Sequence, residues 1–471
     1  ATMLRAAGWA SAVLAVAATA VDRTPEQFHL AFGGPQAADG SERVSVSWYT
    51  ASAVTDPQVC WTTAGSSPCG AGSAAAVSVQ YLDGYGFHHH GYMTGLAPGK
   101  PYEYVVGSAD GPNSTQVTFT VPDSSPTRGP FGVSVFGDMG WLGSKERPDL
   151  IPVSGLKKNW SAVGTRASVE TLKDNAEIDF VWHLGDIAYA DDAFDTDPLS
   201  FNYEKVYNGF VDWFQNVSSI MPYMVSVGNH ESECHSPLCL IGSKAKQLSN
   251  FSAYNARWRM PSDTSGGVQN MWYSYDFGPV HFISVNSETD FPGAGEENVG
   301  DSGDKNLPAG HFGRDGEYLA WLEADLAAAQ ANRATRPWII AGGHRPFPEI
   351  AGNGVQALFA KYEVDLYFCG HTHSYARMYP TYDGTIYPQP NPTHFHAPKG
   401  MTEIVVGGAG CDEMTDELST PAVAKPPSTG VVMATSKVAS GLLQVHNGSA
   451  LHWQLIYSHT GQVLDELWLT K

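Results

Sequence analysis

The stretch Gly185-Asp186-Ile187-Ala188-Tyr189 decides how the chain is organised, and it follows the apolar run Asp179–Leu184. The run predicts a buried strand. Gly185 ends the strand, so Asp186 and Tyr189 lie just beyond its carboxyl end, where open α/β sheets place their ligands. The carboxylate of Asp186 can bridge two metal ions, and the phenolate of Tyr189 is a hard ligand that suits a trivalent ion. A single Gly-Asp at a strand end is more often a turn, so the prediction depends on repetition.

The same pattern occurs at four other apolar strands, which end in Gly137–Gly140 (GDMG), Gly228–Glu231 (GNHE), Gly343–Pro346 (GHRP) and Gly370–His373 (GHTH). In each loop a glycine lets the backbone turn sharply beside a metal-type side chain. Five such loops on one edge of a sheet are improbable by chance. Seven ligands are too many for one tetrahedral ion and suit two ions that share a carboxylate. The candidate ligands are Asp138, Asp186, Tyr189, Asn229, His344, His371 and His373.

Apolar strands alternate with helical patterns after residue 130, which predicts an α/β layered domain over residues 131–400. We expect residues 401–471, which return to strand patterns, to complete this domain. The predicted strands are Phe131–Phe136, Asp179–Leu184, Pro222–Val227, Val280–Val285, Pro337–Ala341 and Val364–Phe368, and the predicted helices are Ser161–Asn175, Tyr203–Phe214, Asp315–Asn332 and Val355–Tyr362.

Residues 22–121 are predicted to form a separate all-β domain, joined to the rest by a Pro/Ser-rich linker at 122–130. Short alternating runs such as Arg43–Tyr49 and Gln116–Val121, separated by Gly and Pro, indicate a β-sandwich of about seven strands. The order of an early tryptophan and the turn Leu96–Tyr102 resembles a fibronectin type III domain. His88–His90 cannot all bind one ion because adjacent strand residues face opposite sides. We expect them to form a wall against the next domain.

The N-terminus has the pattern of a secretory signal peptide over residues 1–20, with Arg5, an apolar run and the cleavage motif Ala18-Thr19-Ala20. The net charge is −21, the pI is about 5.1, and no basic run is present. This composition argues against nucleic acid or anionic membranes as partners. No later stretch is long enough for a membrane anchor. The sequence leaves a homodimer open.

Export to the extracellular space permits disulfides and glycans. The spacing of the six cysteines pairs Cys60 with Cys69 and Cys234 with Cys239, which leaves Cys369 with Cys411, although spacing alone does not fix the connectivity. The glycosylation candidates are Asn113, Asn159, Asn216, Asn250 and Asn447. The chain is therefore expected to be a secreted glycoprotein.

The series GDMG, GDIAY, GNHE, GHRP and GHTH resembles the purple acid phosphatases, a branch of the calcineurin-like metallophosphoesterases, over nearly the whole mature chain. Generic members of that superfamily open with Asp-x-His and lack the tyrosine. Here Gly140 stands at the position of that histidine and Tyr189 supplies the missing ligand. The resemblance implies that Asp138, Tyr189 and His373 bind Fe(III), that Asn229, His344 and His371 bind a divalent ion (Fe, Zn or Mn), and that Asp186 bridges both ions.

The resemblance also implies an acid phosphatase that hydrolyses phosphate monoesters by attack of a metal-bound hydroxide. His230 resembles the family's histidine that faces the phosphate and can protonate the leaving group; alternatively it is a structural residue that orients Asn229. Plant members carry further histidines after the Gly-His-x-Pro loop, whereas the segment Phe347–Gly354 has none. Glu349 or His311 could replace them, or His311 is a surface residue. Other segments resemble fungal and microbial secreted members.

Two alternatives stay open. The motifs bind phosphate and not the leaving group, so the small-molecule phosphate esters that serve as substrates could instead be phosphodiesters, phytate or pyrophosphate. The other alternative is a catalytically inactive protein whose β-sandwich binds a partner. Loss of a ligand would favour it, and no ligand position is missing.

Overall fold

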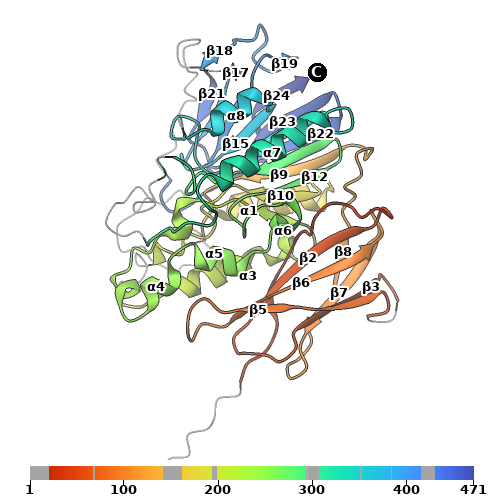
Figure 1. Cartoon of the computed structure of the whole chain (residues 1–471), viewed down its shortest axis with the longest axis vertical. Helices are drawn as coiled ribbons and strands as arrows, with labels where there is room; N and C mark the ends of the chain where they lie inside the picture. The colour runs from red at the N-terminus through yellow and green to blue at the C-terminus, as the bar shows by residue number, and fades with distance from the viewer. Residues whose placement is uncertain are drawn as a thin grey trace, which may run out of the picture.

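The structure is a computed structural model of the chain, shown in Figure 1. It describes residues 21–66, 69–141, 162–193, 199–292, 294, 307–350, 353–382, 384–414 and 430–471. The expected signal peptide at residues 1–20 and the sequon at Asn159 lie outside these residues. Within the described part of the chain, every helix is too short or too polar to span a bilayer.

The N-terminal region folds into two antiparallel four-stranded sheets, seen in orange in the lower part of Figure 1. Because the second sheet covers one face of β2, Val44, Val46 and Trp48 form the sandwich core. The all-β prediction is confirmed, with eight strands instead of about seven. In sheet order the strands are β1 (Glu26–Phe32), β2 (Glu42–Thr50), β6 (Phe87–Leu96) and β5 (Val77–Val79), then β4 (Gly72–Ala75), β3 (Gln58–Thr63), β7 (Pro101–Gly107) and β8 (Val117–Thr120).

The histidine run on β6 lies where the sandwich meets the following domain. The Ser47 hydroxyl donates to Nδ1 of His90 (2.7 Å), and the Nε2–H of His90 donates to the Ala256 carbonyl of the other domain (3.0 Å). His89 faces Thr50 and Ser78 instead. Burial lowers the pKa of His90 to about 3. The expected wall against the next domain is confirmed at His90.

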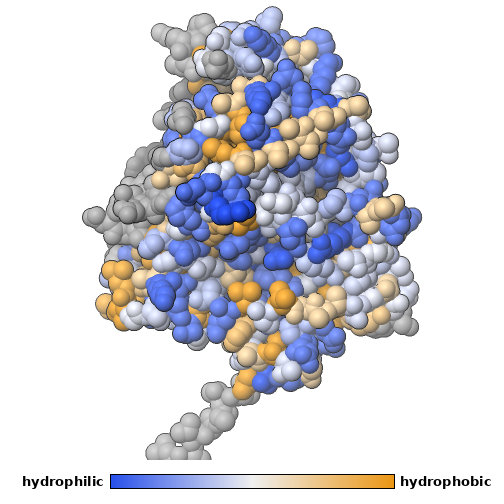
Figure 2. Space-filling view, in the orientation of Figure 1, coloured by the Kyte–Doolittle hydropathy of each residue, from blue (hydrophilic) through white to orange (hydrophobic). Residues whose placement is uncertain are grey.

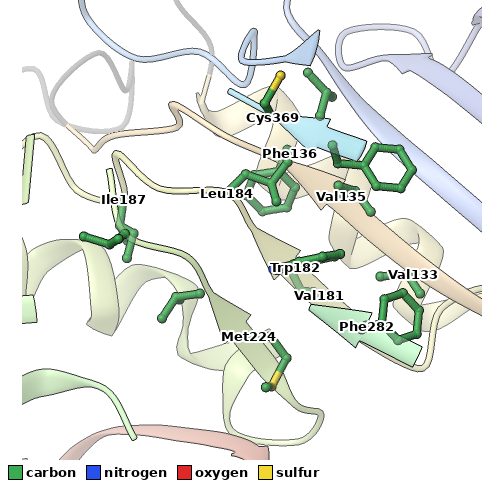
Figure 3. Packing of buried hydrophobic residues seen from close by; sticks show 14 of the residues in the cluster. Val133, Val135, Phe136, Val181, Trp182, Leu184, Ile187, Met224, Phe282 and Cys369 are labelled. Atoms are coloured by element: carbon green, nitrogen blue, oxygen red, sulfur yellow. The ribbon is translucent and has the colours of Figure 1, made fainter. Parts of the chain in front are cut away.

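Residues beyond 130 form two seven-stranded sheets whose inner faces pack together. Figure 3 shows Val133, Trp182 and Phe282 in this core, where the ring centroids of Trp182 and Phe282 are 5.7 Å apart. The first sheet has the order β11 (Tyr223–Val225), β10 (Phe180–His183), β9 (Phe131–Phe136), β22 (Ala439–Asn447), β23 (Ala450–Tyr457), β24 (Val463–Thr470) and β19 (His394–His396). The second has the order β12 (Tyr273–Phe277), β13 (Val280–Ser284), β14 (Trp338–Gly342), β15 (Leu366–Cys369), β20 (Thr402–Val406), β16 (Tyr375–Met378) and β21 (Val431–Thr435).

Helices surround these sheets. In α3, Val206, Phe210 and Phe214 recur every four residues and are buried, which is the pattern of an amphipathic helix. The six predicted strands and four predicted helices all occur, with small changes of bounds, which confirms the α/β layered prediction. The helices are α1 (Ala162–Asp174), α3 (Tyr203–Ser218), α4 (Lys244–Leu248), α5 (Ser252–Arg257), α6 (Ser262–Ser265), α7 (Glu317–Ala331) and α8 (Val355–Lys361), with 3-10 turns η1 (Asn229–Ser232) and η2 (Pro237–Leu240); a small hairpin joins β17 (Thr381–Tyr382) to β18 (Thr385–Ile386).

The sheets end in a way that gathers the glycine loops. Strands β11, β10 and β9 run parallel in one sheet, and β13, β14, β15 and β20 run parallel in the other. The carboxyl ends of both sets meet, because the Gly137 amide after β9 donates to the Val406 carbonyl at the end of β20 (2.9 Å). Strand β11 is an edge strand of the first sheet. Pro222, which directly precedes β11, forms a parallel bridge with Leu30 of β1 in the N-terminal domain.

Two of the three expected disulfides form, Cys60–Cys69 and Cys234–Cys239. The third expectation is wrong, because Cys369 and Cys411 are both free and buried. Cys369 ends β15 with its sulfur 3.8 Å from the Glu403 carboxylate. Cys411 packs in a separate cluster with Tyr189. The pairing of the other four cysteines therefore does not imply that Cys369 and Cys411 are bonded to each other.

Candidate metal centre

Four candidate ligands in the loops that follow the strands have a left-handed backbone conformation, with φ of 60° at Asp138, 51° at Asp186 and Tyr189, and 65° at His371. This conformation is costly for residues other than glycine and is concentrated at functional sites. Glycines then allow close approach. A Cβ on Gly228 would lie 2.3 Å from Oδ1 of Asp186, and a Cβ on Gly370 would lie 2.3 Å from Oδ2 of Asp138.

Asp186 lies at the middle of the candidate ligands. One group of ligand atoms within 4.8 Å of one another comes from Asp186, His344 and His371, and another comes from Asp138, Asp186 and His373. Asp186 is the member common to both groups. Its Oδ1 accepts the His230 backbone amide (3.0 Å), and its Oδ2 lies 2.8 Å from Nε2 of His344.

Asn229 presents its carbonyl oxygen to two histidines. Its Nδ2 donates to the buried Glu233 carboxylate (2.9 Å), which fixes the orientation of the amide. Its Oδ1 therefore faces Nε2 of His344 (3.1 Å) and Nδ1 of His371 (3.0 Å). Glu233 acts as an outer partner of the kind that orients metal ligands.

On the side of Asp186 where Asp138 and His373 lie, Tyr189 joins the candidate ligands. The Tyr189 hydroxyl lies 2.9 Å from Nε2 of His373 and 3.4 Å from Oδ1 of Asp138. The backbone amide of His371 donates to both oxygens of Asp138 (3.1 and 2.9 Å). Five of the seven candidates are fully buried, and the side chains of His371 and His373 keep 10% and 14% of their surface exposed. The structure thus brings all seven predicted side chains together.

The donor atoms fit a cation better than they fit one another. The Nδ1–H of His344 donates to the Leu184 carbonyl (2.8 Å), so Nε2 of the neutral ring carries a lone pair. That lone pair faces Oδ2 of Asp186, which is buried and has no hydrogen-bond partner. Two acceptors at this distance repel unless a proton or a metal ion lies between them.

Electrostatics supports the same arrangement. Burial disfavours a charged His344, but the carboxylates of Asp186 and Asp138 outweigh burial and raise its pKa to about 10. Burial also opposes charge on His373, yet its neighbours, Cys411 and Asp138 among them, raise its pKa to about 12. Without metal, these histidines hold protons in a strongly negative site. Metal binding would displace those protons.

His230 lies beside the seven candidate ligands but was not predicted to be a ligand itself. Its Nδ1 is 2.7 Å from Oδ2 of the buried Asp191, and its Nε2 is 3.9 Å from Oδ2 of Asp186. The ring lies over Tyr189 with centroids 4.2 Å apart. Burial lowers the pKa of His230, but Asp191 and Asp186 outweigh it and hold the pKa well above its usual range.

Three carboxylates with supporting roles escaped the sequence analysis. Glu231 accepts the backbone amides of Asp186 (2.9 Å), Ile187 (2.8 Å) and Gly228 (2.9 Å), so it joins two ligand loops. Glu233 orients Asn229, and Asp191 orients His230. The GNHE motif contains Glu231, which was a usable signal. Glu233 and Asp191 carry none, because a single carboxylate next to a loop is common.

The two further candidates for a proton donor differ in position. Oε2 of Glu349 lies 3.1 Å from Nε2 of His371, so Glu349 borders the candidate centre. His311 is 52% exposed and lies 3.8 Å from the Asp290 carboxylate. The structure does not bring His311 to the seven candidates. A cavity of about 680 Å³ lined by Trp338, Phe359 and Met401, among others, contains none of the seven either.

Comparison with known proteins places this geometry in a family. Residues 25–121 match the purple acid phosphatase N-terminal domain, residues 133–375 the calcineurin-like phosphoesterases, and residues 400–466 the iron/zinc purple acid phosphatase-like C-terminal region. An acid phosphatase type 7 of Mus musculus is 30% identical over 95% of this chain and 91% of its own length. The chain belongs to the purple acid phosphatase family.

Fungal relatives support membership of the purple acid phosphatase family. An acid phosphatase of Aspergillus ficuum is 29% identical over 82% of this chain and 76% of its own length. The solved purple acid phosphatase PPD1 from yellow lupin seeds has the same fold, with a TM-score of 0.69 at 19% identity, covering 95% of this chain and 74% of its own. The candidate centre therefore lies on the fold of the purple acid phosphatases.

Proposed function

We propose that the chain is an acid phosphatase that hydrolyses phosphate monoesters at a binuclear centre of Fe(III) and a divalent ion (Fe, Zn or Mn). In this proposal Asp138, Tyr189 and His373 hold the ferric ion, and Asp186 bridges. The divalent ion is held by Asn229, His344 and His371. Family membership supports a metal-dependent phosphoesterase, and the homologous acid phosphatases support the monoester reaction.

The observation that carries the proposal is the position of Asp186. It belongs to both groups of mutually close ligand atoms, as a bridging carboxylate must. The tyrosine belongs to one side only, where its hydroxyl lies near Asp138 and His373. A hard phenolate beside a carboxylate favours the trivalent ion on that side, and the amide with two imidazoles suits a divalent ion.

When bound, the two ions would supply positive charge that neutralises the phosphate and would make water more acidic. The chain's own residues then position the substrate and move a proton. Asp191 holds Nδ1 of His230, which leaves Nε2–H directed away from it, toward the centre. The raised pKa keeps that proton in place at acid pH. His230 can therefore hydrogen-bond the phosphate or give its Nε2 proton to the departing ester oxygen.

We also propose that the protein is secreted and glycosylated. The signal-peptide pattern at residues 1–20 and the two disulfides support export. The described sequon asparagines Asn113, Asn216, Asn250 and Asn447 are all exposed, so a glycan would not need a buried side chain to move. The domains proposed are a sandwich over 22–121, a linker at 122–130 and a catalytic domain over 131–400 completed by 401–471.

The test is the colour and activity of a Tyr189→Phe variant. A ferric ion bound to tyrosinate gives a visible absorption band, so we expect the purified protein to be coloured and to hydrolyse 4-nitrophenyl phosphate in acid. Tyr189→Phe should lose the band while elemental analysis still detects iron. The matched control is Tyr275→Phe, the same change at a buried hydroxyl in the sheet core. If the band and the activity both survive in Tyr189→Phe, the ligand assignment is wrong.

A further inference from the structure

The open side of the centre is bordered by two exposed carboxylates. The side chain of Glu413 is 42% exposed, and its Oε2 lies 3.5 Å from Nε2 of His230 and 4.0 Å from Nε2 of His373. On the other side Glu349 is 39% exposed, with Oε2 at 3.1 Å from Nε2 of His371. His371 and His373 are the partly exposed ligand candidates. Glu349 and Glu413 therefore lie on the partly exposed side of the seven candidates.

The cationic groups beside this opening are already matched by carboxylates. Nε of Arg345 lies 2.9 Å from the buried Glu288, and its Nη1 lies 3.3 Å from Glu349. The charge on His230 faces Asp191 at 2.7 Å. Arg345 and His230 are thus each shared between a buried carboxylate and an exposed one, so carboxylates outnumber these two cations here.

A bound monoester would place its phosphate on the ions and direct its leaving group outward, past the two rim carboxylates. We propose that Glu349 and Glu413 select monoesters whose leaving group is neutral or cationic and discriminate against those whose leaving group is anionic. This inference rests on the proposed phosphatase function and names the substrate class of that same site. It also disfavours phytate and pyrophosphate, whose leaving groups carry negative charge.

The selection has a simple electrostatic cause. An anionic leaving group would come within several ångströms of two like charges in a partly desolvated site, whereas an ammonium group would be attracted by them. The effect is exposed to solvent, so salt must weaken it. The phosphate group itself is unaffected, because the ions and His230 bind it. Discrimination should therefore appear mainly in KM.

The experiment compares two substrates of nearly equal size, phosphoethanolamine and 2-phosphoglycolate, with the metal-loaded, full-length enzyme at low ionic strength. We expect kcat/KM to be about tenfold higher for phosphoethanolamine, because its leaving group carries an ammonium where the other carries a carboxylate. Glu413→Gln and Glu349→Gln should each reduce this ratio about threefold, mainly through KM, and raising the salt should reduce it as well.

The matched control is Glu323→Gln, which removes one exposed carboxylate, paired with Lys361, on the remote helix α7 and should leave the ratio unchanged. Equal rates on both substrates in the wild type, or an unchanged ratio in the double variant Glu349→Gln/Glu413→Gln, would overturn the inference. Hydrolysis of 4-nitrophenyl phosphate separates the two failures. If that activity is present without charge preference, the rim proposal alone fails, and if it is absent, the proposed function fails.

Discussion

The protein buries histidines in two regions and surrounds them oppositely. At the candidate centre, His344 lies among carboxylates that raise its pKa to about 10. At the domain interface, His90 contacts a hydroxyl and a carbonyl, and burial, together with the nearby basic groups of His29 and Arg259, lowers its pKa to about 3. Both rings are buried. Burial alone therefore does not fix the protonation state of a buried histidine; the charges around it do.

The opposite surroundings of His344 and His90 match the different requirements of the two regions. The interface needs a ring that packs and donates one hydrogen bond while staying neutral. The centre needs a negative potential, which bound cations neutralise. Without cations, the buried carboxylates lower the free energy of unfolding of the protein. Figure 2 shows residues of hydrophilic or intermediate hydropathy over most of one face of the molecule, with hydrophobic residues gathered in patches.

The largest effect is expected from Asp186→Asn, which removes the carboxylate shared by both ligand groups. We expect kcat to fall on the order of a thousandfold, as for other groups that hold transition-state charge. At least one of the two metal ions should be lost, as measured by elemental analysis. Asp174→Asn, an exposed change at the end of α1, is the control. Full metal content with full activity would place the bridge elsewhere.

A smaller effect is expected at the interface from His90→Phe. An aromatic ring is kept, but Ser47 and the Ala256 carbonyl lose their partner, which costs about 2 kcal/mol of the free energy of unfolding at neutral pH. The folded pKa of about 3 lies below the unfolded value of about 6.5, so His90 costs stability as pH falls through that window. Denaturant unfolding should thus show the deficit narrowing toward pH 4. A deficit that widens in acid would contradict the neutral assignment.

The smallest effect is expected from His281→Gln, which tests the rule outside both regions. His281 lies between Asp276 (2.7 Å) and Asp325 (2.9 Å); burial opposes its charge, but these carboxylates raise its pKa to about 9. Its stabilisation is complete below pH 6.5 and is lost as pH rises through 9. The variant should therefore lose about 1–2 kcal/mol in acid and little above pH 9. The pH trend is opposite to that of His90→Phe, and equal trends would refute the comparison.

Much of the centre was predictable because each ligand follows an apolar strand and a glycine. This local signal also predicts that the ligands lie close together, because the carboxyl ends of parallel strands meet at one edge of a sheet. The partners of the ligands were not predictable in the same way. Glu233 and Asp191 act through single contacts between distant loops, and no spacing in the sequence marks them.

The fold shows the same division. Strands such as β9 and β10, which are mostly apolar and fully buried, were located within a residue or two. Strand β22 was missed although it lies at the middle of a sheet, between β9 and β23, because glycine and polar residues interrupt its apolar pattern. The pairing of Cys369 with Cys411 failed because it rested on elimination and not on any signal of proximity.

The bridge between Leu30 and Pro222 has a consequence for how the chain can be divided. Strand β11 is the last in its sheet, and an uncovered last strand invites pairing with other molecules. The N-terminal sandwich shields that edge with its own first strand. Cutting the chain after residue 130 would uncover this edge, so the catalytic half would be prone to aggregate when made alone. By covering the edge at β11, the sandwich is expected to keep the catalytic domain soluble.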